Sequence, residues 1–187
     1  MLPKSKFREG YELSKANAIR IIDEAKYNFE KGFFATACYL GFLGIEEIGK
    51  AMLFLKYWDM DGISRDLWEN EFKDHITKLH FVIRIIVRYI KDIWKRMPRI
   101  KPDKTSDVSE NMFDRGIGKM HQLAKMWSVF VDFNFYSGKY IYPKDDYISY
   151  RIESYANMLF DTGAGYTEMA LNALEFFERD TLQCLLR

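Results

Sequence analysis

The sequence predicts an all-α protein, a helical bundle of five to six helices. Apolar residues recur at helical spacing through most of the chain, and no strand-like alternation persists. There is neither an internal repeat nor a low-complexity tract. A length of 187 residues, with 48% hydrophobic residues, suits one core of ordinary size. We therefore expect residues 1–187 to form a single domain.

The first two helices are predicted to follow each other closely. Ser14 is expected to cap a helix that runs to about Lys31, with Gly32 ending it. The second helix then extends from about Phe34 to Tyr57 and stops at "DMDG". The connection from this second helix to the third is also short, which favours antiparallel neighbours.

A long third helix is predicted from Ser64 to about Met97, because apolar residues form one stripe along it and Pro98 closes it. The polar, proline-bearing segment that follows is typical of a loop. A fourth helix is expected over residues 111–131.

The remaining part begins with the aromatic stretch 132–143, "DFNFYSGKYIYP", which is predicted to be an ordered loop or a short extended segment. Helical periodicity returns over residues 145–186. The sequence "DTGAG" interrupts it, so we expect two helices there.

Composition excludes several functional classes. The net charge of +1 does not favour general nucleic-acid binding, so any such contact needs a local patch. Two cysteines, Cys38 and Cys184, both fall in apolar helical patterns, which is typical of buried residues in a reducing cytosol. The chain has no apolar signal core, and its best apolar run is too short to span a membrane. We expect a cytoplasmic protein with no membrane contact and no cofactor.

Charged residues interrupt the second helix in "GIEEIGKAMLF". Glu46 falls in the middle of an apolar stripe. Glu47 lies roughly 100° from Glu46 about the helix axis, and Lys50 lies between the two in this projection. Buried carboxylates need positive partners. His75 and Lys78 of the next helix can supply them if the two helices are antiparallel. The sequence predicts a buried charge network that either fixes helix register or forms a catalytic site.

A di-metal carboxylate site is disfavoured as a third interpretation. Such bundles use glutamates placed three residues before histidines, and no glutamate here has that spacing. Two lysines would also crowd the cations. Gly41, Gly44 and Gly49 lower helix propensity, and their expected use is close approach of neighbouring helices.

The segment "YELSKANAIRIIDEAKYNFEKGFFATACYLGFLGIEEIGKA", followed by "DHITK", resembles the AbiV family of abortive-infection proteins. The shared features are a leading alanine-rich helix, an "EE-x-GK" helix and a later "H-x-x-K". The stretch "WSVFVDFNFYSGKYIYP" is similar to the family's "YVD" segment, with Phe130 where tyrosine is expected. The resemblance implies a helical fold of the HEPN class, a role in phage defence, and growth arrest through a block of translation.

Many HEPN proteins are metal-independent ribonucleases whose dimers bring together two "R-x(4-6)-H" motifs. In this chain "RGIGKMH", Arg115 to His121, has that spacing. Histidine can act as general base or acid on RNA, and arginine can hold the charge of the phosphorane. The resemblance thus implies a homodimer with Arg115 and His121 as catalytic residues. The alternative is that they form an ordinary pair on a helix surface.

Basic residues also gather on the outer side of the third predicted helix. They offer phosphate contacts for a nucleic acid, or else a solvated helix face. The candidate nucleic-acid-binding residues are Arg84, Arg88, Lys91, Lys95 and Arg96.

Two mechanisms remain open for an AbiV-like protein. As an enzyme, it would cut RNA without metal at Arg115 and His121, or at His75 with Lys50 and Lys78. As a non-enzymatic effector, it would be activated by a phage-encoded protein and would bind a component of the translation machinery. In that second case the network around Glu46 and Glu47 only holds the scaffold.

Overall fold

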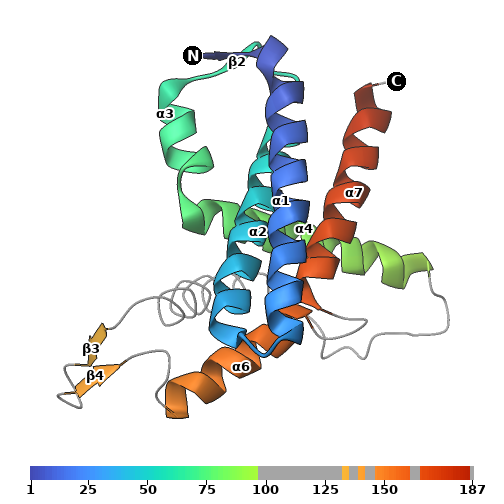
Figure 1. Ribbon diagram of the computed structural model, residues 1–187. Helices are drawn as coiled ribbons and strands as arrows, with labels where there is room; N and C mark the ends of the chain where they lie inside the picture. Colours follow the sequence, from blue (N-terminus) through green and yellow to red (C-terminus); the bar gives the residue numbers. More distant parts are fainter. Residues whose placement is uncertain (97–131, 135–138, 142–145, 161–164, 186–187) are drawn as a thin grey trace.

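The computed structural model describes the backbone of five stretches of the chain, and Figure 1 shows their arrangement. These stretches are residues 1–96, 132–134, 139–141, 146–160 and 165–185. Side chains are described for residues 1–93, 152–160 and 165–179. The helix expected over 111–131 lies outside the described residues.

Helix α1, Phe7–Glu30, begins earlier than predicted. Ser14 is not its cap but a buried residue within it. The reason is that Phe7 and Tyr11 extend the buried stripe of Ser14 and Ala18 toward the N-terminus at helical spacing. The prediction of Ser14 as the capping residue was therefore wrong.

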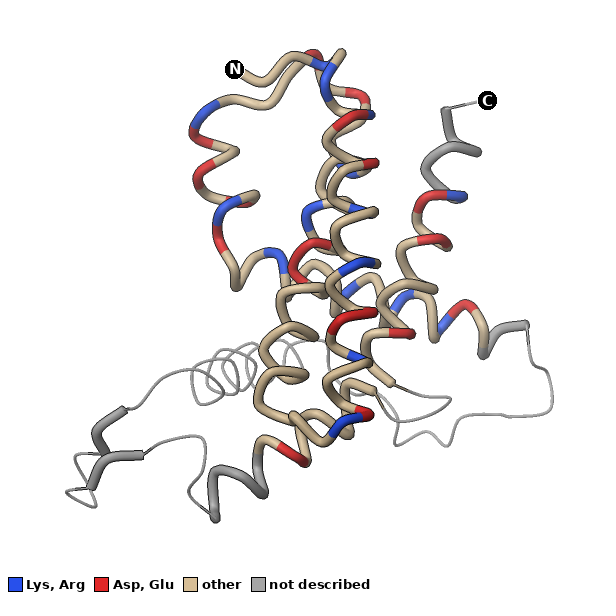
Figure 2. Tube along the Cα trace, viewed as in Figure 1, with Lys and Arg blue, Asp and Glu red and all other residues tan. Residues whose placement is uncertain are grey.

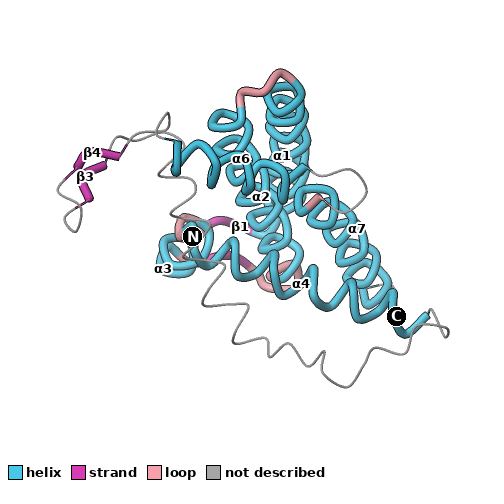
Figure 3. The backbone as a smooth tube through the Cα atoms, turned by 90° about the horizontal axis from the view of Figure 1, so that it is seen from below, coloured by secondary structure: helices cyan, strands magenta, loops and turns pink. Residues whose placement is uncertain are grey.

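Helix α2, Phe34–Lys56, lies at the centre of the bundle. It follows α1 through a turn at Gly32, whose φ of +76° is in the region that glycine adopts readily. Helices α1, α4, α6 and α7 all contact α2, and Figure 3 shows them around it. Most of α2 is consequently buried, which explains why its sequence is apolar on nearly every side.

Three glycines of α2 permit this close packing. A Cβ atom on Gly44 would lie 2.5 Å from Ile22 Cγ1 of α1, and one on Gly41 would lie 2.8 Å from Phe160 Cζ of α6. A Cβ atom on Gly49 would lie 2.8 Å from the backbone oxygen of Lys78 in α4. The prediction that these glycines serve close helix approach is confirmed.

The chain after α2 departs from the predicted continuous helix over 64–97. A two-stranded ribbon forms first, in which β2, Gly62–Ile63, pairs antiparallel with β1, Leu2–Pro3. A short helix α3, Arg65–Leu67, then leads into the π-helical turn η2, Trp68–Phe72. Only after residues 73 and 74 does helix α4, His75–Arg96, begin.

Local contacts explain this interruption. Trp68 and Phe72 stack with ring centroids 4.8 Å apart, and Phe72 meets Phe54 of α2 edge-on at 4.9 Å. At the next residues, Asp74 accepts a hydrogen bond of 2.7 Å from the backbone N–H of Thr77. Such a contact is typical of a residue that caps a new helix. The aromatic cluster holds η2 against α2, and Asp74 starts α4 in a new direction.

The cap at Asp74 makes part of the stability sensitive to acid. Burial acts to raise the pKa of its carboxyl, but hydrogen bonds from Thr77 and the charges of His75 and Lys78 outweigh burial and lower that pKa below 3.8, the ordinary value. Because the folded-state pKa is the lower one, this stabilisation is complete above the unfolded-state pKa and is lost as the pH falls through the folded-state pKa.

The melting temperature should fall as the pH is lowered from about 5 to about 2. We expect this fall to be smaller in Asp74→Asn than in the wild type. Circular dichroism at a series of pH values would measure this decrease in both proteins. An identical decrease in the variant would contradict the assignment.

The C-terminal part matches the prediction. Strands β3, Asp132–Asn134, and β4, Lys139–Ile141, form an antiparallel hairpin where an extended segment was one of two expectations. Helices α6, Asp146–Phe160, and α7, Tyr166–Leu185, follow, separated at the predicted break. The prediction of an all-α helical bundle is confirmed. None of the described helices has the length and hydrophobicity needed to cross a membrane.

Candidate functional site

The predicted charge network lies where α2 and α4 cross. The two helices approach so closely at Gly49 that its α-carbon faces the backbone of Lys78. Glu46, one turn earlier in α2, and Lys78 are both nearly buried, with side chains 4% and 6% exposed. This crossing brings charged groups of the two helices into one cluster, as predicted, but α4 runs across α2 (Figure 1) and not antiparallel to it as expected.

The central contact of the cluster joins Glu46 to His75. Glu46 Oε2 lies 2.5 Å from His75 Nδ1. The imidazole is 60% exposed, because His75 is the first residue of α4 and projects beyond the helix crossing. A hydrogen bond from Nδ1 to a carboxylate orients the ring and leaves Nε2 for another partner. A buried carboxylate thus holds a histidine whose second nitrogen can act on a molecule in solvent.

Lys78 adds positive charge at the buried end of the cluster. Its Nζ lies 4.0 Å from Glu46 Oε2, the same oxygen that contacts His75. A buried carboxylate is stable only when cations or hydrogen-bond donors surround it. Glu46 is therefore anchored by two residues on the same face of α4, His75 in its first turn and Lys78 one turn later.

Glu47 and Lys50 form a second pair beside the first. Lys50 Nζ donates a hydrogen bond of 2.5 Å to Glu47 Oε1, and the side chains are 27% and 19% exposed, respectively. This pair is therefore partly solvated, whereas Glu46 and Lys78 are not. Lys50 adds a partly exposed cation on the helix that carries Glu46.

Sequence reasoning missed Asp74, which belongs to the same cluster. Its pKa is lowered partly by the charges of His75 and Lys78, so the three groups interact. The missed pattern was an aspartate placed three residues before a threonine, at the point where a new helix could be capped. The apolar stripe continues without a break through this point, so the sequence pattern did not indicate that a new helix starts after Asp74.

The other predicted site residues lie elsewhere or outside the described part. Arg84, Arg88 and Lys91 are exposed on α4, and Figure 2 shows the basic residues along this helix. Arg84 follows His75 by nine residues, or two and a half turns, so the two side chains leave α4 on opposite sides. The structure therefore does not bring the basic residues and the Glu46–His75 pair onto one face.

The remaining candidates are not tested by the structure. Lys95 and Arg96 lie in α4, but their side chains are outside the described part. The motif residues Arg115 and His121 fall in the stretch 97–131, which is also outside it. Within the described part, His, Cys, Asp and Glu nowhere gather in a group of three or more that could hold a metal ion. Cys38 is buried, as predicted.

The close contact at Gly49 predicts a loss of stability when a methyl group is added. Gly49→Ala would place its Cβ against the backbone of Lys78, which cannot rotate away. We expect the free energy of unfolding to fall by about 1–3 kcal/mol. Gly41→Ala is the matched control, because its Cβ would meet the tip of the Phe160 ring at the same 2.8 Å, and a ring tip can move more readily than backbone. Urea unfolding would compare the two variants, and an equal or smaller loss for Gly49→Ala would contradict the prediction.

The all-α architecture agrees with the fold that the sequence resemblance implies, that of the HEPN class. Comparison with family models gives the particular family. The model for AbiV, a HEPN family, matches residues 6–147, so this chain belongs to the AbiV family. The matched stretch contains α1, α2 and α4, and with them the whole Glu46–His75 cluster. Neither the curated proteins nor the solved structures gave a match.

Proposed function

We propose that this protein arrests translation when a phage infects the cell, and that it does so in the cytoplasm by cutting RNA without a metal ion. Membership of the AbiV family supports the role in abortive infection. The single structural observation that supports the chemistry is the pairing of an exposed imidazole, His75, with a buried carboxylate, Glu46. This pairing is what a general base needs.

The proposed reaction uses a hydroxyl group of the RNA itself. His75 Nε2 takes the proton of a ribose 2′-hydroxyl, and the resulting oxygen attacks the adjacent phosphorus. A 2′,3′-cyclic phosphate forms, the bond to the next nucleotide's 5′-oxygen breaks, and that oxygen takes a proton from water. Glu46 stabilises the imidazolium that holds the abstracted proton. Lys50, a partly exposed cation four residues after Glu46 in α2, is the candidate to stabilise the phosphorane charge.

The basic residues of α4 would hold the RNA away from the reacting bond. Arg84 lies about 14 Å along the helix axis from His75, at 1.5 Å per residue. Arg88 and Lys91 continue that exposed row, and Lys95 and Arg96 follow in the sequence. Contacts to phosphates on that side require a folded RNA wide enough to reach both faces of α4. The proposed substrate class is therefore structured RNA, such as transfer or ribosomal RNA.

A second candidate function rests on the burial of the same cluster. Glu46 and Lys78 are almost inaccessible, and they lie at the closest approach of α2 and α4. Buried charges in such a place can serve helix register alone. In that case the protein is an effector without chemistry, which a phage-encoded protein activates and which binds part of the translation machinery. A homodimer is compatible with both candidates.

Infection of cells that produce the protein distinguishes these candidates. We expect incorporation of labelled amino acids to stop after infection in cells with the wild-type chain, and to continue with His75→Ala. Arrest lost in His121→Ala instead would assign the chemistry to Arg115 and His121. Arrest retained in both histidine variants, at wild-type protein levels, would overturn the ribonuclease proposal and favour the effector.

A further inference from the structure

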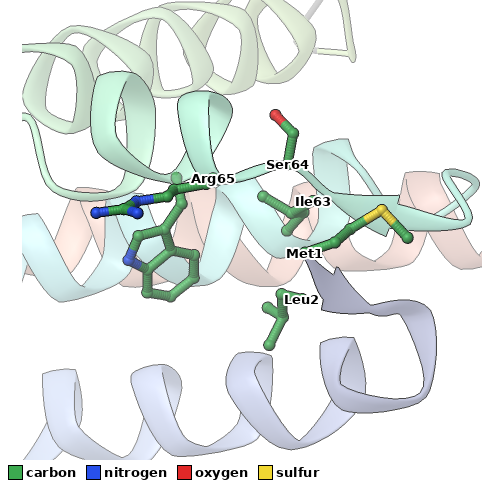
Figure 4. A pocket seen from close by; sticks show the side chains of 6 residues that line it. Met1, Leu2, Ile63, Ser64 and Arg65 are labelled. Atoms are coloured by element: carbon green, nitrogen blue, oxygen red, sulfur yellow. The ribbon is translucent and has the colours of Figure 1, made fainter.

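An apolar opening lies at the N-terminal ribbon, apart from the Glu46–His75 cluster. Its volume is about 330 Å³, near the lower end of the range of ligand-binding pockets. Figure 4 shows the side chains of Met1, Leu2 and Ile63 around it, with Arg65 on one side. Met1 remains 86% exposed, so the opening leaves apolar surface in contact with water. The lining residues are Met1, Leu2, Ile63, Ser64, Arg65 and Trp68.

Arg65 supplies the charge of this opening. It is the single ionisable side chain that lines it. The guanidinium has no ion-pair or hydrogen-bond partner among the described side chains, and the neighbouring Asp66 instead accepts a hydrogen bond from Asn70. An apolar surface beside an uncompensated cation is complementary to a group that combines an apolar side chain with a carboxylate.

The ribbon adds a backbone edge next to the opening. The N–H of Lys4 donates to the oxygen of Asp61 at 3.2 Å, which makes these two residues a hydrogen-bonded pair. Because such pairs alternate along an antiparallel ladder, the next pair, Pro3 and Gly62, is not hydrogen-bonded. The N–H and C=O of Gly62 therefore point away from β1.

The outer edge of β2 is thus able to accept another strand. Within the described part of the chain, the ribbon consists of β1 and β2 without a third strand. Gly62 can offer one donor and one acceptor there, and Ile63, the next residue, lines the opening. An extended peptide recognises such an edge through its main chain and an adjacent pocket through its side chains.

We propose that this opening binds an extended acidic segment of a partner protein. The segment would pair with Gly62, place an apolar side chain against Leu2 and Trp68, and bring a carboxylate to Arg65. A peptide fits better than a small amphiphile, because only a peptide uses the edge of β2. This binding site does not depend on RNA cleavage, so either proposal can fail without the other.

Fluorescence anisotropy with a labelled hexapeptide of alternating aspartate and valine tests the proposal on the full chain. We expect saturable binding, and affinity at least about tenfold lower for a peptide of alternating aspartate and serine. Two further peptides carry N-methyl groups on alternate amides, each on one of the two alternating sets. The peptide whose methyl groups block the amides that face β2 should bind with lower affinity. Arg65 is exposed, and Arg65→Glu should lower the affinity for the acidic peptide about tenfold. The same variant should raise the affinity for a peptide of alternating lysine and valine.

Three results would overturn the proposal. One is the absence of saturable binding up to about 1 mM peptide, a concentration that corresponds to very weak affinity. Another is equal binding of the acidic peptide by the wild type and by Arg65→Glu with an unchanged melting temperature. The third is equal affinity for the unmodified peptide and both N-methylated peptides, together with displacement of the bound peptide by octanoate. That result would assign the opening to a small amphiphile.

Discussion

His75→Ala is expected to lower the rate of RNA cleavage by about a hundredfold to ten-thousandfold, the range that general acid–base catalysis contributes. Although the imidazole is 60% exposed, its loss removes the closest partner of the buried Glu46, so we also expect a lower melting temperature, and the assay is run at a temperature at which both proteins are folded. A single-turnover assay with excess protein and a labelled stem-loop RNA would measure the rate. Added imidazole should restore part of the activity, which a purely structural role would not allow.

His80→Ala is the matched control for that variant. His80 lies on the same helix, five residues after His75, and is not part of the Glu46 cluster. It should retain the wild-type rate. Equal losses in the two variants, or a loss in His75→Ala that imidazole leaves unchanged, would contradict the role of His75 as the general base.

Lys78→Leu is expected to destabilise the fold by about 3 kcal/mol, because it removes a cation from a buried carboxylate. Lys78 and Glu46 are both nearly inaccessible to water, so the negative charge of Glu46 loses a neighbour that solvent cannot replace. The double variant Glu46→Leu/Lys78→Leu should recover much of this loss, since apolar residues often replace a buried ion pair without cost. Urea unfolding would give the three free energies.

Lys73→Leu provides the comparison with a solvated pair. Lys73 Nζ lies 2.9 Å from Glu69 Oε1, and the side chains are 60% and 44% exposed. An exposed pair of this kind contributes at most about 1 kcal/mol. If Lys78→Leu were no more destabilising than Lys73→Leu, the account of Glu46 as a buried and compensated charge would be wrong.

The meeting of Glu46 with His75 and Lys78 was predictable from the sequence. Glu46 interrupted an otherwise apolar stripe, and a buried carboxylate requires positive partners. The short connection between helices restricted those partners to the next helix. Glycine at position 49 indicated close approach at the same level of the bundle, and the structure places it against Lys78.

The exposure of His75 was not predictable in the same way. Apolar periodicity continued from Ser64 to Met97, so one helix was expected, with His75 packed at the edge of its stripe. Periodicity does not register a π-helical turn or a capping aspartate, because both depend on contacts with other elements. The stacking of Trp68 on Phe72 and the cap at Asp74 end one segment and begin another at His75. The imidazole is therefore at a helix start, where solvent reaches it.

The measurement that tests the central claim most directly is cleavage of end-labelled transfer and ribosomal RNA by the purified protein in the presence of a chelator, beside His75→Ala. The account predicts that the wild type cuts the RNA and leaves 2′,3′-cyclic phosphate ends, and that His75→Ala does not. RNA that stays intact with the wild type, or that His75→Ala cuts equally well, would contradict it.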